Sequence, residues 1–170
     1  MSTSCLEAPP SGLVQGIEEF NRGEFFECHD TLEGLWMTER RPIRHLYQGI
    51  LQIGVAFYHL QKGRYRPVLT LLRRGSKYLE PFAPACMQVD VAGLLTDATR
   101  CLAEVQRLGS DDLNNFDWSL VPKIEFQKIQ GSLSGERQTP DEDKERDLSI
   151  HVSEVGPTET LLRRAESQNE

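Results

Sequence analysis

The chain has 170 residues, of which 38% are hydrophobic and 26% charged, and its net charge is −7. This balance is typical of a globular domain and excludes collagen-like chains. No apolar run approaches the roughly 20 residues that a bilayer-spanning helix needs, so we expect no membrane partner. The first ten residues lack the basic and apolar regions of a targeting peptide, which favours a cytoplasmic location.

The charge is concentrated at one end of the chain. Residues 131–170 carry 10 acidic and 5 basic side chains and no aromatic residue. A segment of this composition cannot bury enough apolar surface to offset its ordering entropy. We therefore predict a disordered acidic tail, which could recruit a protein partner.

The remaining residues are nearly neutral. Residues 1–130 contain 16 acidic and 14 basic side chains, which argues against nucleic-acid binding. Two short basic clusters, Arg40–Arg44 and Arg64–Arg74, are interpreted as solvated surface. The sequence predicts a flexible N-terminus over residues 1–10 and a helical-bundle domain over residues 11–130.

The spacing of apolar residues predicts an all-α fold, a compact bundle of about five helices with an extended C-terminal segment. Ser11 is a candidate N-cap for the first helix, and Gly23 suits a left-handed turn at its end. A second helix is expected over about residues 24–38. The third, over about residues 43–61, is apolar around most of its circumference, which is typical of a central helix.

The second half of the domain has its own signals. Pro67 suits the first turn of a fourth helix, in which Gly75 would allow a close approach to a neighbour. Asp90 is a candidate cap for a fifth helix that ends near Gly109. Residues 116–126 mix aromatic, polar and proline residues, so we expect a non-helical segment that lies over the bundle.

The four cysteines have no C-x-x-C spacing, so neither structural zinc nor a disulfide framework is expected. They are Cys5, Cys28, Cys86 and Cys101. We expect free thiols packed as small hydrophobes. Cys28 precedes His29, but neighbours in sequence point about 100° apart on a helix, so their adjacency predicts no catalytic Cys–His pair.

Polar residues recur on the faces of two helices that should be buried. His29 and Glu33 are four residues apart at the margin of the second helix's apolar face. On the third helix, Gln48, Gln52 and His59 lie within about 60° of one another. A buried polar group without a hydrogen bond costs about 1–3 kcal/mol, so these two faces should meet in one buried polar cluster. Its candidate flank consists of Glu27, Asp30, Trp36, Arg44 and His45.

Two arginines near the start of the third helix need a partner. Arg41 and Arg44 lie at the positive end of the helix dipole, where cations are disfavoured. We expect an acidic partner such as Glu33, Asp30 or Glu39.

Two strings carry a family resemblance. Residues 20–36 read FNRGEFFECHDTLEGLW, and residues 47–52 read YQGILQ. Together with Tyr58-His59, they resemble the family catalogued as domain of unknown function 309, small all-helical bundles of bacteria and plastids. The resemblance covers roughly residues 13–95 and implies no reaction, because the family has no established activity. The functional residues that it implies are Glu27, His29, Asp30, Glu33, Trp36, Gln48, Gln52 and His59.

Three roles fit the predicted cluster. It could be a structural hydrogen-bond network that fixes the register of two helices. It could belong to a non-catalytic binding or regulatory module. It could instead serve a small metal-assisted hydrolase in which His29 and Glu33 hold a divalent metal with His59 or Asp30. We expect no cofactor, since glutamine is a poor ligand for zinc or iron. The sequence is compatible with either a monomer or a homodimer.

Overall fold

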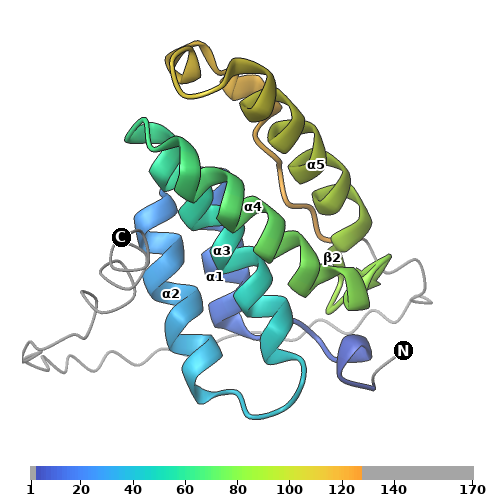
Figure 1. Cartoon of the computed structure of the whole chain (residues 1–170). Coiled ribbons are helices and arrows are strands. Elements are labelled where there is room, and N and C mark those ends of the chain that lie inside the picture. The colour runs from blue at the N-terminus through green and yellow to red at the C-terminus, as the bar shows by residue number, and fades with distance from the viewer. Residues whose placement is uncertain (1–2, 128–170) are drawn as a thin grey trace, which may run out of the picture. The chain divides into compact units, whose positions relative to one another are not determined.

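The computed structural model describes residues 3–127, and the predicted acidic tail lies outside them. This part of the chain is mostly helical, with one two-stranded sheet, which confirms the predicted all-α fold (Figure 1). Within it, no helix combines the length and the apolar character needed to cross a bilayer. The α-helices are α1 (Ser11–Asn21), α2 (Phe25–Thr38), α3 (Arg44–Gln61), α4 (Tyr65–Leu79) and α5 (Val91–Leu108).

Helix α3 is the central element, as its apolar circumference predicts. It makes extensive contacts with both α2 and α4 (Figure 1), and most of its residues are buried. The ring of Phe57 packs edge-on against Phe20 of α1, with 6.0 Å between the ring centroids, and 5.5 Å from the ring of Phe25 on α2. These contacts join the first three helices in one core.

Helices α3 and α4 touch through their backbones. A Cβ atom added to Gly75 would lie 2.9 Å from the carbonyl oxygen of Gly49, and one added to Gly49 would lie 3.0 Å from that of Gly75. Real Cβ atoms scarcely fit at such distances, which confirms the predicted close approach at Gly75. The crossing fixes the position of α4 against the central helix.

The proposed helix-end signals are confirmed at Gly23, Pro67, Asp90 and Gly109 and fail at Ser11. Gly23 follows α1 with a φ of 78°, and the Asp90 carboxylate accepts a hydrogen bond of 3.0 Å from the backbone N–H of Gly93. Ser11 is not the N-cap, because the carbonyl oxygen of Pro10 already accepts a helical bond from the N–H of Val14. The helix therefore begins one residue earlier than expected, with Pro10 at the N-cap and no side-chain cap.

The segment after α5 follows the bundle surface, as predicted. Its described residues form the short 3-10 helices η3 (Leu113–Asn115) and η4 (Trp118–Leu120) and a single β-bridge between Phe126 and Val89. The Asn21 carboxamide at the end of α1 donates to the Ile124 carbonyl at 2.9 Å and accepts from the Ile124 N–H at 2.8 Å. This pair of bonds ties the last described residues to the first helix.

A short hairpin connects α4 to α5, after the 3-10 helix η2 (Glu80–Phe82). Strand β1 (Ala85–Cys86) pairs antiparallel with β2 (Val89–Asp90). We did not predict this hairpin, because two-residue strands are too short to show a period of two.

The N-terminal segment is joined to this hairpin. Residues 3–6 form the 3-10 helix η1 (Thr3–Leu6) where we expected a flexible N-terminus, and a disulfide links Cys5 to Cys86. The expectation of free thiols was therefore wrong for these two residues. The two cysteines are 81 residues apart, and only the fold brings them together. Cys28 and Cys101 are free and buried.

Candidate functional site

Helix α2 carries polar groups beside its buried apolar face. Phe25, Cys28 and Leu32 pack into the core. His29 and Glu33 follow them around the helix with only 5% and 9% of their surfaces exposed. Their burial agrees with their position at the margin of the apolar face.

Asp30 joins these two residues in what we call the α2 cluster, consisting of His29, Asp30 and Glu33. The Nδ1 atom of His29 lies 3.1 Å from Oδ1 of Asp30. One ligand atom from each of the three residues lies within 4.8 Å of the others. The Asp30 side chain is 40% exposed, so the cluster reaches solvent through this residue.

The donor set suits a divalent cation. An imidazole nitrogen and carboxylate oxygens are common ligands of zinc, in whose tetrahedral sites the ligand atoms are about 3.4 Å apart. The three ligand atoms lie within 4.8 Å of one another, so the side chains would have to close by about 1 Å to reach that spacing. Of the two third ligands considered for His29 and Glu33, this group contains Asp30 and does not contain His59.

His59 lies near the end of α3 and is 1% exposed. Its ring packs edge-on against the ring of Tyr58, with 5.8 Å between centroids. Its carbonyl oxygen accepts hydrogen bonds from the N–H groups of Lys62 and Arg64. These backbone bonds close the end of α3.

The two glutamines are half-buried on α3. Within residues 3–127, no hydrogen bond joins Gln48 or Gln52 to His29 or Glu33, so the docking of these groups stays a prediction. The glutamines also open toward α4. They line a cavity of about 620 Å³ together with residues of that helix; its lining is Gln48, Gln52, Arg74, Lys77 and Tyr78.

Trp36 and Arg44, two of the predicted flank residues, pack against each other. The Arg44 guanidinium carbon lies 4.9 Å from the centroid of the Trp36 ring, a cation–π arrangement. Among the described residues, no carboxylate pairs with Arg44, so the expected acidic partner was wrong for this residue. The electron-rich face of the Trp36 ring contacts the Arg44 cation instead of a carboxylate.

Arg41 has the acidic partner that we expected. Its guanidinium donates to Glu39 at 2.9 Å and to Glu7 at 2.9 Å. The hydrogen bonds from Arg41 lower the pKa of Glu39 to about 2. This pair lies in the loop between α2 and α3, where it offsets the unfavourable helix dipole.

The other two predicted flank residues are not members of the α2 cluster. Glu27 is exposed. His45 is also exposed and stacks on Tyr78 of α4 with 5.3 Å between ring centroids, while its Nδ1 atom lies 3.2 Å from Oε1 of Gln48. His45 therefore belongs to the α3–α4 side of the molecule.

Cys28 is unsuited to nucleophilic chemistry. It is fully buried, and desolvation raises the pKa of its thiol to about 12. The thiolate, which is the nucleophile, is therefore scarce at neutral pH. This supports the inference that Cys28 and His29 form no catalytic pair.

One protein-family model matches the part of the chain that contains the α2 cluster. The model of the family described as Domain of unknown function (DUF309) matches residues 13–71. No curated protein and no solved structure matches the chain. The predicted resemblance is confirmed for most of α1, for α2 and α3, and for the first half of α4. Residues 72–95, which the resemblance was expected to include, lie outside the match, as do the basic residues that line the α3–α4 cavity.

Proposed function

We propose that this protein, which carries a DUF309 family match over its first three helices, is a non-catalytic binding module that holds a divalent cation at the α2 cluster. The observation behind this proposal is the convergence of one imidazole and two carboxylates within 4.8 Å. Two carboxylates beside one imidazole leave the cluster short of positive charge, and a divalent cation would supply it.

Burial favours binding over turnover. Catalytic zinc sites keep one position open for water or substrate. Here His29 and Glu33 are almost fully covered, and Asp30 alone gives access. A small ion can enter past the partly exposed Asp30 carboxylate, whereas a substrate would reach few atoms of the site.

The second candidate is a small metal-assisted hydrolase that uses His29 and Glu33 as ligands. The exposure of Asp30 is the observation in its favour, because a metal-bound water could occupy the open side. The two candidates differ in what the bound ion does.

Calorimetric titration of the full chain tests the cation site. The protein is stripped of metal and titrated with Zn²⁺ and with Mn²⁺. We expect one ion per chain, with Asp30→Asn and Glu33→Gln weakening the affinity about tenfold or more. Glu27→Gln is the matched control, since Glu27 is an exposed carboxylate on the same helix. An equal loss in the control would overturn the proposal.

Activity of the metal-loaded chain separates the two candidates. Hydrolysis of an activated phosphodiester that follows metal occupancy and disappears in Glu33→Gln would favour the hydrolase. Stoichiometric metal without turnover would favour the binding module.

The second part of the proposal is that the protein acts as a regulatory module by binding a protein partner. Residues 131–170 carry a net charge of −5, which suits a basic surface on a cytoplasmic partner. A chain shortened at residue 130 should lose such a partner in a pull-down while keeping its cation affinity. Retention of every partner by the shortened chain would contradict this role.

A further inference from the structure

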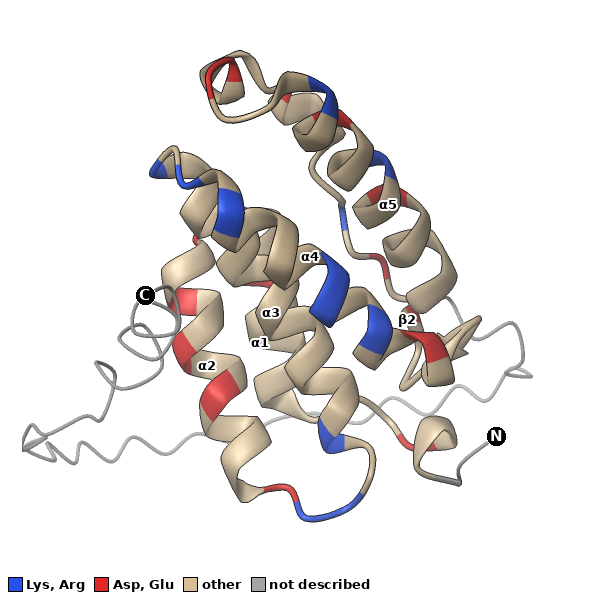
Figure 2. Ribbon diagram, viewed as in Figure 1, with Lys and Arg blue, Asp and Glu red and all other residues tan. Residues whose placement is uncertain are grey.

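Helices α3 and α4 flank a second polar site, which is open to solvent and distinct from the α2 cluster. The cavity of about 620 Å³ between them lies within the size range of small-molecule sites, about 300–1,000 Å³. Lysine and arginine residues follow α4, whereas aspartate and glutamate residues follow α2, on the other side of α3 (Figure 2). The two helices thus present opposite charges.

The cavity lining has a positive charge and contains no carboxylate. Arg74 and Lys77 are exposed and lie three residues apart on α4. Within the described residues, neither forms an ion pair or a side-chain hydrogen bond. Two cations whose donors are unused favour a dianionic ligand, such as a phosphate monoester at neutral pH.

The opposite wall carries carboxamides suited to hydroxyl groups. The Oε1 atom of Gln52 is buried and accepts no hydrogen bond from residues 3–127. A buried acceptor left in this state costs about 1–3 kcal/mol. Rotation of the carboxamide toward the cavity that Gln52 lines would let a ligand hydroxyl satisfy it. Gln48 has its Oε1 atom 3.2 Å from Nδ1 of His45, which leaves the amide NH₂ group to donate to the ligand.

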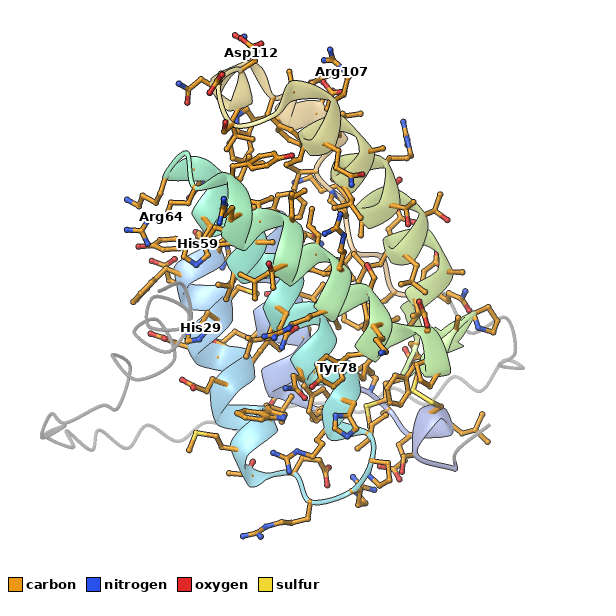
Figure 3. All side chains as sticks on the ribbon, viewed as in Figure 1. His29, His59, Arg64, Tyr78, Arg107 and Asp112 are labelled. Carbon is orange, nitrogen blue, oxygen red and sulfur yellow. A yellow bond between two sulfur atoms is a disulfide. The ribbon has the colours of Figure 1, made fainter. Side chains whose placement is uncertain are left out.

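The walls of this cavity are held in place. The backbones of α3 and α4 touch at Gly49 and Gly75, which directly follow Gln48 and Arg74. Tyr78, which also lines the cavity, is stacked on His45 (Figure 3). A preorganised site loses less entropy on binding.

We propose that the α3–α4 cavity binds a small phosphorylated polyol, with the phosphate on Arg74 and Lys77 and the hydroxyl groups on Gln48 and Gln52. Both halves of the ligand are needed, because the basic wall recognises the charge and the carboxamide wall recognises the hydroxyls. The residues of the basic wall lie outside the family match, which ends at residue 71.

Calorimetry of the full chain with ribose 5-phosphate and glycerol 3-phosphate tests the proposal. At least one should bind at one per chain and more tightly than ribose or inorganic phosphate alone. Arg74→Gln and Lys77→Gln should each weaken binding about ten- to a hundredfold. Arg73→Gln is the matched control, because Arg73 is an exposed neighbour that does not line the cavity.

A further variant addresses the carboxamide wall. Gln52→Leu should weaken the binding of the phosphorylated polyol but leave the affinity for inorganic phosphate unchanged. The melting temperature of this variant shows that it folds. The proposal is overturned if neither compound binds at millimolar concentration, if Arg73→Gln has the effect of Arg74→Gln, or if inorganic phosphate alone binds as tightly. Asp30→Asn should leave the affinity for the phosphorylated polyol unchanged. The proposal for this cavity is therefore tested independently of the proposed cation site at the α2 cluster.

Discussion

Replacing Gly75 with alanine should destabilise the protein by forcing α4 away from the central helix. The new Cβ atom would lie 2.7 Å from Cγ1 of Ile53 and 2.9 Å from the carbonyl oxygen of Gly49. The Ile53 side chain could rotate, but the carbonyl belongs to the α3 backbone and cannot. Overpacking of a core costs about 1–3 kcal/mol, which exceeds the gain of about 1 kcal/mol from alanine's higher helix propensity.

Gly34→Ala is the control for this substitution. Gly34 also lies inside a helix, but a Cβ atom there would meet nothing within 4 Å. It should raise stability by up to about 1 kcal/mol. Urea denaturation followed by circular dichroism measures both free energies of unfolding. Equal stabilisation by the two substitutions would refute the close backbone contact between α3 and α4.

The remaining predictions concern burial, thiols and pH. His29→Ala should lower the free energy of unfolding by about 2 kcal/mol, because the substitution removes a buried imidazole and its contact with Asp30; unchanged urea denaturation would show that the ring has no structural partner. Thiol titration of the native chain should find no fast-reacting group, since burial raises the pKa of Cys28 and Cys101 to about 12. Denaturant alone should expose two thiols, and four should react after reduction; four without reductant would exclude the disulfide. Arg41→Gln should lower the melting temperature at neutral pH, because the pKa of Glu39 is about 2 when paired and about 4.3 in the unfolded chain. That stabilisation is complete above pH 4.3 and is lost as the pH falls through 2, so a difference between variant and wild type that stays constant down to pH 2 would contradict the pairing.

The sequence predicts those features that depend on local periodicity or capping. The Asp90 cap, the left-handed turn at Gly23 and the central position of α3 follow from side-chain chemistry within a few residues. The close approach at Gly75 is also readable, because a glycine inside an amphipathic helix usually marks a packing constraint.

Features that depend on distant parts of the chain are not readable in this way. The disulfide links residues 81 positions apart, and spacing alone carries no information about that pairing. Arg44 lies over the Trp36 ring because the loop between α2 and α3 turns it there. Arg74 and Lys77 look like solvated surface until α3 places two glutamines opposite them.

The most direct test of the cation site follows the imidazole signals of His29 in ¹H–¹⁵N spectra while Zn²⁺ is added to the full chain. The account predicts that these signals change up to one equivalent of Zn²⁺, and that the exposed His45 serves as the unchanged reference. If the signals of His29 stay in place while those of His45 move, the cation binds elsewhere and the α2 cluster is not its site.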